Sequence, residues 1–281
     1  MSECCLVFED ALFPVILAEE ADFLVAYKPP RMHSVPQAAS RGNNMLEYLV
    51  KDFPEIMKIE GRREGEGGML HRLDFETQGL LLIARTSQGM EALLGLQSAG
   101  KIVKEYSAVA MKSEMTLPGF PMCKPEIIPM PCGEEMYHDA YGTQSENAFC
   151  VKSAFRPHGK GRKAVRPVAV ADGNDNNPGI KGRSREIAFD HGKPYVTEIC
   201  KYSEKPAGVG NFLLRIRRGF RHQIRSHLAW MRMPILNDLL YGGIEYGRGL
   251  LALRACSIAF NDPFTGEYRR YSIAGLQPDT L

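Results

Sequence analysis

The chain has 281 residues, 44% of them hydrophobic, and a formal net charge of +2. This length and apolar content allow a sizeable core, which excludes an intrinsically disordered chain. The longest purely apolar runs, such as residues 80–84, are far shorter than the roughly 20 residues that cross a bilayer. The opening "MSECCLVFED" lacks the basic and apolar regions of a secretory signal, so we expect a soluble, cytoplasmic protein without a membrane partner.

The cysteine content predicts neither a disulfide framework nor a zinc site. Seven is an odd number, and no Cys-x-x-Cys pair is present. We therefore expect mostly reduced thiols. The seven residues are Cys4, Cys5, Cys123, Cys132, Cys150, Cys200 and Cys256.

The first predicted elements are a strand and a helix. "DFLVAYKPP" (22–30) is rich in β-forming residues and is closed by two prolines, which favours a strand. "NNMLEYLVKDF" (43–53) has helical spacing, with Asn43 or Asn44 available as its N-cap.

A strand, a helix and a further strand are expected next. The apolar run 79–84 predicts a strand. Thr86 or Ser87 can then cap a helix that ends at about Ser98. "KIVKEYSAVA" (101–110) favours another strand.

The segment of about 113–193 differs from the rest. Prolines, glycines and asparagines accumulate and regular periodicity fades, which predicts long loops. Between Lys152 and Arg185, nine Lys or Arg stand against two Asp. This positive stretch is either a solvated loop or a surface that contacts RNA.

The last part of the chain again shows regular patterns. Strands are predicted over 193–203 and 211–219, and a helix over 220–231 that ends near a proline at 234. The tail 250–273 is typical of a hairpin of two strands joined by a turn.

Chemically, the most informative stretch is "HRLDFETQGLLLIAR" (71–85), in which polar groups precede an apolar strand. In an extended segment Arg72 and Asp74 point to one side, so a base and an acid emerge together. The alternative interpretation is an ordinary surface ion pair at the entrance of a strand.

At these residues the sequence resembles the RluA-type RNA pseudouridine synthases, whose signature reads His-Arg-Leu-Asp, two variable residues, Thr-Ser-Gly and an apolar strand. "DFLVAYKPP" is similar to the family's opening strand, and "KEYSAVA" to its Lys-x-Tyr strand. "RRGFRHQIRSHLAWMRMPILNDLLYGG" is similar to its His-Gln-Ile-Arg-x-His segment with the following Pro-Ile and Asp-x-x-Tyr-Gly. These blocks occur in the family's order and cover nearly the whole chain.

Four positions depart from the family pattern. Gln78 replaces a serine, Phe220 stands where a basic residue is usual, Arg221 replaces a threonine and Asn237 replaces a glycine. None of these changes removes a group that the reaction needs. They suggest a shifted RNA specificity, with Arg221 making up for the charge missing at Phe220.

The resemblance implies an α+β fold: a long, bent, mixed β-sheet flanked by helices and loops, with a central active-site cleft. We expect one catalytic domain over 1–281, with a loop-rich basic insertion at about 113–193. Because the opening strand begins near residue 22, we expect no N-terminal RNA-binding module of the S4 type. We further expect a monomer.

The resemblance also implies the reaction, which converts uridines within ribosomal or transfer RNA to pseudouridine without a cofactor. Asp74 would act as nucleophile or stabilise positive charge on the sugar. Arg225 would neutralise it in a close contact, through a two-point fork. Tyr106 would stack on the flipped uracil or take part in proton transfer.

Five further residues are implied as substrate contacts: Arg72, Arg221, His222, Gln223 and Ile224. Arg72 would fill the gap left by the flipped base or contact phosphate. His71 is expected to be a hydrogen-bonded structural histidine. His222 and His227 are five residues apart on a helix and so do not share a face, and we expect no metal.

Two other functions remain open. A catalytically silent RNA-binding protein of the same fold would use the basic stretch and not the aspartate. A nucleoside or sugar hydrolase would need a second carboxylate. Glu76 is the only nearby candidate for it.

Overall fold

Two units, each assembled from segments that are distant in the sequence, make up the chain. Unit 1 comprises Met1–Ser107 and Leu253–Leu276, and unit 2 comprises Ala108–Ala252 and Gln277–Leu281. The expectation of a single domain over 1–281 stays a prediction. The computed structural model describes the following residues: 3–6, 12–37, 42–122, 125, 128–129, 148–169, 187–189 and 192–276.

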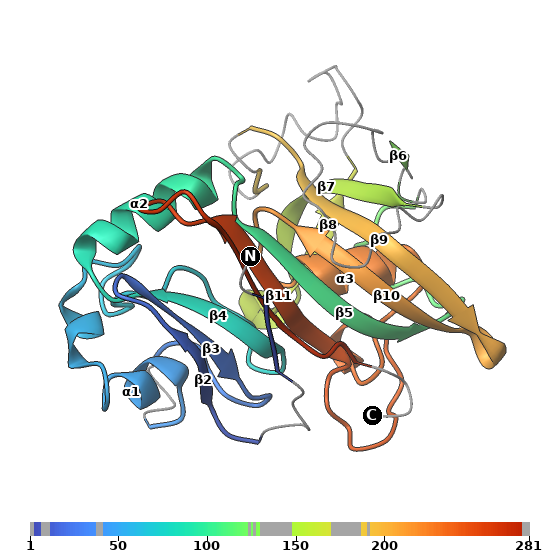
Figure 1. The fold of residues 1–281 in the computed structure, drawn as a ribbon. Coiled ribbons are helices and arrows are strands. Elements are labelled where there is room, and N and C mark those ends of the chain that lie inside the picture. Colours follow the sequence, from blue (N-terminus) through green and yellow to red (C-terminus); the bar gives the residue numbers. More distant parts are fainter. Residues whose placement is uncertain are drawn as a thin grey trace. The chain divides into compact units, whose positions relative to one another are not determined.

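Unit 1 is built on a mixed sheet, shown in Figure 1. Strands β2, β3 and β4 pair antiparallel, whereas β4 runs parallel to β11, which lies between β4 and β5. β12 pairs antiparallel with β11 and parallel with β1. The bounds are β1 Glu3–Leu6, β2 Val15–Glu19, β3 Phe23–Lys28, β4 Gln78–Ala84, β5 Val103–Met111 (to Ser107 in this unit), β11 Leu253–Asn261 and β12 Tyr268–Ile273.

The start of β4 is fixed by a glycine. Every residue of β3 and β4 is buried, as expected for strands covered on both faces. Gly79 has a φ of +127°, and a Cβ there would lie 2.3 Å from the carbonyl oxygen of Ala255. Only glycine allows β4 to approach β11 so closely, directly after the polar segment that contains Asp74.

The helices of unit 1 are short, and side chains cap the N-termini of its two α-helices. They are α1 Met45–Leu49, the 3-10 helix η1 Pro54–Lys58 and α2 Ser87–Ser98. Asn44 Oδ1 accepts a hydrogen bond from the Glu47 N–H, and Thr86 Oγ1 accepts one from the Gly89 N–H. The predicted caps Asn44 and Thr86 are therefore confirmed.

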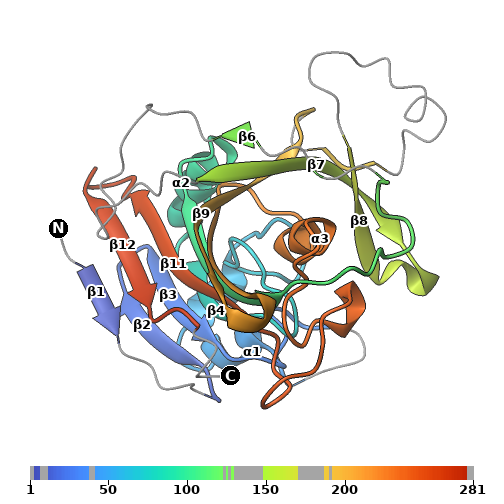
Figure 2. The same cartoon turned by 90° about the vertical axis from the view of Figure 1, so that its right-hand side faces the viewer.

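Unit 2 contains the remaining strands, which Figure 2 shows around helix α3. From the end of β5 the sheet order is β5-β10-β9-β7-β6, and β8 pairs with β7. The pairs β10–β9, β9–β7, β7–β6 and β7–β8 are antiparallel. The bounds are β6 Ile128–Pro129, β7 Phe149–His158, β8 Ala164–Val168, β9 Tyr195–Lys205 and β10 Val209–Ile216.

Helix α3 (Gln223–Trp230) packs against β8 and β9 and is buried along its whole length. His227 anchors it through hydrogen bonds of 2.8 Å to Ser153 on β7 and to Thr197 on β9. Burial lowers the pKa of His227 to about 3, so the ring is neutral at physiological pH. Three 3-10 helices complete the described part of the unit: η2 Lys160–Arg162, η4 Pro206–Gly208 and η5 Leu239–Tyr241.

The described elements confirm the predicted α+β class. The strands and helices expected outside 113–193 are present within a few residues of their predicted bounds. The prediction of loops over 113–193 is wrong for β7 and β8, which form a regular antiparallel hairpin. Residues 170–186 of the basic stretch lie outside the described residues.

Two other expectations concern helices and cysteines. None of the helices in the described ranges is long and apolar enough to cross a membrane. Cys150, Cys200 and Cys256 form no disulfide within this part of the chain. The other four cysteines lie outside the residues whose side chains are described.

Candidate active site

Asp74 lies in an irregular segment whose backbone is anchored on both sides of it. On one side, the Ser34 hydroxyl accepts from the Leu73 N–H and donates to the Leu73 carbonyl, both at 3.0 Å. On the other side, Lys28 Nζ lies 3.4 Å from the Phe75 carbonyl oxygen. These contacts fix the backbone at Asp74, which is half-buried.

Lys28 is a cation beside this segment that was not assigned a role from the sequence. It is fully buried, and its Nζ also donates to the carbonyl oxygens of Pro29 at 2.9 Å and Met32 at 2.8 Å. Burial lowers the pKa of Lys28 to about 7, against the opposing charges of Asp74 and Glu76. The Lys-Pro pair that ends the opening strand was the sequence feature that could have drawn attention to Lys28.

Tyr106 lies on β5 in unit 1 and is 6% exposed. Burial raises the pKa of its phenol far above the usual value, and the charges of Asp74 and Cys256 act in the same direction. The phenol therefore stays protonated and is poorly suited to act as a base. Its surroundings favour stacking or hydrogen-bond donation.

Arg72 and His71 have different environments. Arg72 Nη1 lies 3.0 Å from Glu66 Oε1, and the Arg72 side chain is 42% exposed. His71 Nε2 accepts a hydrogen bond of 3.2 Å from the Leu82 N–H, which confirms the predicted structural histidine. The Arg72 side chain is accessible for a contact with RNA, and that role stays a prediction.

In unit 2, Arg225 is held by a carboxylate that follows it in the sequence. Its Nε and Nη2 donate to the two oxygens of Asp238, at 2.7 and 2.8 Å. Both side chains are at least 97% buried, and the guanidinium carbon lies 5.4 Å from the centre of the Tyr241 ring. Asp238 and Tyr241 belong to the Asp-x-x-Tyr-Gly block, but the sequence did not indicate this contact.

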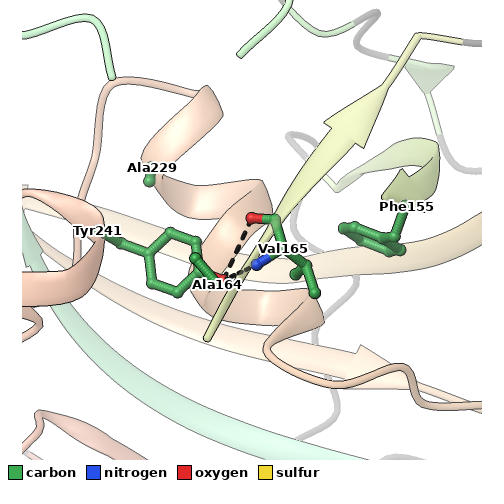
Figure 3. Close-up of a cluster of buried hydrophobic side chains, with 5 residues drawn as sticks. All are labelled: Phe155, Ala164, Val165, Ala229 and Tyr241. Carbon is green, nitrogen blue, oxygen red and sulfur yellow. Dashed lines mark hydrogen bonds between the residues drawn. The ribbon is translucent and has the colours of Figure 1, made fainter. Parts of the chain in front are cut away.

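Tyr241 connects this region to the β7–β8 hairpin, as Figure 3 shows. Its hydroxyl accepts from the Val165 N–H at 2.9 Å and donates to the Val165 carbonyl at 3.2 Å. His222 Nδ1 lies 3.1 Å from the same hydroxyl. The start of α3 and the hairpin are therefore tied to one phenol.

The other predicted contacts of α3 are engaged within unit 2. The Arg221 guanidinium donates to the carbonyl oxygens of Arg162 and Ala164. The Gln223 side chain donates to the Val196 carbonyl at 2.9 Å. Ile224 is 4% exposed. These contacts indicate structural roles, and the predicted roles in substrate binding remain predictions.

Besides Arg221, the other three departures from the family pattern also have a structural explanation. Phe220 stacks on Phe155 with the ring centres 5.1 Å apart. Asn237 has a φ of +65°, a left-handed conformation that asparagine tolerates better than most residues, and its side chain bonds to Tyr246 and Leu250. Gln78 Oε1 accepts from the Tyr27 hydroxyl at 2.7 Å.

The predicted site residues thus fall into two groups. Arg72, Asp74 and Tyr106 belong to unit 1. The other predicted site residues belong to unit 2: Arg221, His222, Gln223, Ile224 and Arg225. The predicted contact between Asp74 and Arg225 stays a prediction.

Comparison with known families gives the site its context. Residues 22–230 match the family model described as RNA pseudouridylate synthase, and this range includes Asp74, Tyr106 and Arg225. The chain belongs to this family. The membership predicted from the four sequence blocks is therefore confirmed.

Two curated relatives carry the name ribosomal large subunit pseudouridine synthase D. The chain is 27% identical over 228 residues to the ribosomal large subunit pseudouridine synthase D of Yersinia pestis, covering 81% of this chain and 52% of the relative. The protein of the same name from Pasteurella multocida is also 27% identical, over 84% of this chain and 55% of the relative. The chain therefore spans about half the length of these relatives.

Solved structures show the same fold at low sequence identity. Human RNA pseudouridylate synthase domain containing 1 aligns with a TM-score of 0.59 and 18% identity, over 96% of this chain and 87% of that chain. Human RNA pseudouridylate synthase domain containing 4 aligns with a TM-score of 0.56, also at 18% identity, over 93% and 88%.

Proposed function

We propose that the chain isomerises uridines in RNA to pseudouridine, with Asp74 as the catalytic carboxylate and no cofactor. The observation that carries this proposal is the anchored backbone around Asp74, with Leu73 and Phe75 both held, in the segment that carries the family signature. A catalytic carboxylate must be held in a productive geometry, and these anchors supply that restraint.

In the proposed reaction Asp74 acts on a uridine flipped out of its stack. Its carboxylate either bonds to the reacting carbon or stabilises positive charge on the sugar while the N-glycosidic bond breaks. The uracil then turns and rejoins the same sugar through carbon, so no atom is lost and no oxidant is needed. The Asp74 charge in turn acts on Lys28, where it opposes the lowering of the lysine pKa by burial.

Tyr106 is proposed to contact the flipped uracil as a neutral phenol, because its raised pKa disfavours proton abstraction. Arg225 is proposed to orient Asp74. The fork to Asp238 fixes the plane of the Arg225 guanidinium, which would set its orientation towards Asp74. A contact between Asp74 and Arg225 remains the prediction made from the sequence.

Ribosomal RNA is the first candidate substrate, because the relatives' names refer to the large ribosomal subunit. Transfer RNA is the alternative. The β7–β8 hairpin supports an RNA partner, since residues 148–169 contain six Lys or Arg and no Asp or Glu.

The proposal is tested with RNA carrying tritium at C5 of uridine. Pseudouridine formation releases this label, and we expect release from wild-type incubations without an added cofactor. RNA binding without release would favour the silent RNA-binding protein. Free uracil among the products would favour the hydrolase. Sequencing the modified positions would distinguish ribosomal from transfer RNA.

A further inference from the structure

Glu66 is a buried carboxylate that holds an arginine close in sequence to the proposed catalytic residue. Its side chain is 11% exposed, whereas the neighbouring carboxylates Glu60 and Glu64 are exposed. Glu66 Oε1 lies 3.0 Å from Arg72 Nη1, and the Arg72 side chain is 42% exposed. Glutamates are almost never buried unless they are paired. This pair therefore joins a buried acid to a cation that can still reach a ligand.

The chain at Glu66 is packed too tightly to shift. Gly68, two residues on, donates through its N–H to the Ile56 carbonyl at 3.0 Å, and its own carbonyl accepts from the Ala84 N–H at 2.8 Å. A Cβ at Gly68 would lie 2.1 Å from the Ala84 carbonyl oxygen, so only glycine allows this approach. The Glu66 carboxylate thus starts from a fixed backbone, and the long Arg72 side chain is the partner whose freedom the pair restricts.

Arg72 lies on the same side of the chain as Asp74. Leu73 stands between them, and its side chain is buried, whereas Arg72 is exposed and Asp74 half-buried. This is the alternation of an extended segment, in which residues two apart are separated by roughly 7 Å. The Ser34 hydroxyl holds the backbone N–H and carbonyl of Leu73 in place. RNA bound at Asp74 would therefore meet the Arg72 guanidinium.

The Glu66 carboxylate changes what Arg72 can offer to RNA. An arginine without a partner binds the phosphates of any RNA, because that contact is electrostatic and independent of sequence. A carboxylate at 3.0 Å offsets the charge of the guanidinium and repels a phosphate that approaches it. The planar group can still stack on a base or donate to base edges, contacts that need orientation more than charge.

We propose that Glu66 is a positioning residue that determines specificity. It holds Arg72 and offsets its charge, so that this arginine contacts bases beside the target uridine and not the phosphates of any RNA. This inference rests on the proposed function. It also chooses between the two roles predicted for Arg72, because a phosphate at this arginine would face the Glu66 carboxylate.

Two variants separate the charge of Glu66 from its hold on Arg72. Glu66→Gln keeps the size and an acceptor oxygen but removes the charge. Its affinity for a labelled RNA of unrelated sequence should rise, and the dependence of log affinity on log salt should steepen by about 0.7 to 0.9, the value for one phosphate contact. Glu66→Met also removes the acceptor, so tritium release at saturating target RNA should slow about tenfold or more, because Arg72 is no longer held.

Glu64→Gln is the matched control, because it removes an exposed carboxylate two residues away and changes the net charge equally. It should leave the salt dependence and the turnover near wild-type values. A double-mutant cycle adds the second control. In the Arg72→Ala background, Glu66→Gln should not steepen the salt dependence further, because Glu66 acts through Arg72.

The inference is overturned by an unchanged salt dependence in Glu66→Gln, or by an equal steepening in Glu64→Gln, which net charge alone would explain. Steepening that persists in the Arg72→Ala background would also overturn it. Glu66→Gln preserves the shape of the side chain, so these binding measurements stand even if Glu66→Met does not fold. Failure of the proposed function is a separate result, in which the wild type binds RNA but forms no pseudouridine.

Discussion

Unit 1 contains two buried lysines whose surroundings differ. Lys28 Nζ bonds to the carbonyl oxygens of Pro29 and Met32 and lies in the field of two carboxylates. Lys104 is also buried, and it lies in the field of the cation Arg62. Carboxylates thus oppose the effect of burial on the pKa of Lys28, whereas a like charge adds to the effect of burial on the pKa of Lys104. Burial alone therefore does not define the environment of a lysine, because the charges around it also matter.

The largest effect on activity should come from removing the Asp74 carboxylate, whose charge acts on Lys28. Asp74→Asn keeps the size of the side chain and removes its charge, so we expect the rate of tritium release to fall by about a thousandfold or more. The urea unfolding midpoint should change little, because Asp74 is only half-buried. Turnover at the wild-type rate in this variant would refute the assignment of Asp74.

Asp238→Asn would extend the comparison to unit 2, because it takes the carboxylate away from a third buried cation, Arg225. Losing one partner of a buried ion pair typically costs about 3–5 kcal/mol of the free energy of unfolding. The double variant Arg225→Met, Asp238→Leu should be more stable than Asp238→Asn. A loss below about 1 kcal/mol in Asp238→Asn would mean that the pair contributes little.

Lys28→Met should gain less stability than Lys104→Met. Both variants lose an ammonium group whose pKa is lowered by burial, but Lys28→Met also leaves the carbonyl groups of Pro29 and Met32 without their donor, which costs about 1–3 kcal/mol for each unsatisfied group. Turnover should also slow, because the Phe75 anchor beside Asp74 is lost. If Lys28→Met and Lys104→Met were equally stable, the contrast between the two lysines would be wrong.

The pH dependence of stability tests the lowered pKa of Lys104. The pKa of Lys104 is about 8 in the folded protein and 10.5 as the reference value, so between these values the unfolded chain binds more protons. The contribution of Lys104 to the free energy of unfolding of the wild type therefore rises with pH. Lys104→Met should be more stable than the wild type by about 3 kcal/mol at pH 7, and by much less at pH 10. An advantage independent of pH would contradict the lowered pKa.

The smallest effect on stability should come from exposed lysines. Lys160 and Lys163 lie at the exposed tip of the β7–β8 hairpin. Replacing both by glutamine should change the free energy of unfolding by less than about 0.5 kcal/mol. If the hairpin contacts RNA, the salt dependence of binding should become shallower by about 1 to 2. The pair Lys51→Gln, Lys58→Gln, at exposed positions of unit 1, is the control for charge alone.

Much of the fold followed from local patterns. The strand over 23–28 and the helix that begins after Thr86 were predicted because apolar periodicity and caps are encoded in adjacent residues. The β7–β8 hairpin was missed because Pro157 and Pro167 weaken the strand pattern. Among the strands of the described residues β8 pairs with β7 alone, so Pro167 lies at an edge, where proline is tolerated.

The sequence supplied the candidate residues of the site but not their contacts. Asp74, Tyr106 and Arg225 came from the family signature, which gives identities and order. The Ser34 and Lys28 anchors and the Arg225–Asp238 fork depend on how segments pack, and a single sequence does not encode that locally.

The anchors on both sides of Asp74 also limit how this region can change during evolution. Lys28 and Ser34 reach the segment at Leu73 and Phe75, and only five residues separate Lys28 from Ser34 in the chain. An insertion or deletion between them would move one anchor away from its carbonyl while the other stayed in place. Length changes should therefore be excluded from residues 29–33, even where individual side chains vary freely.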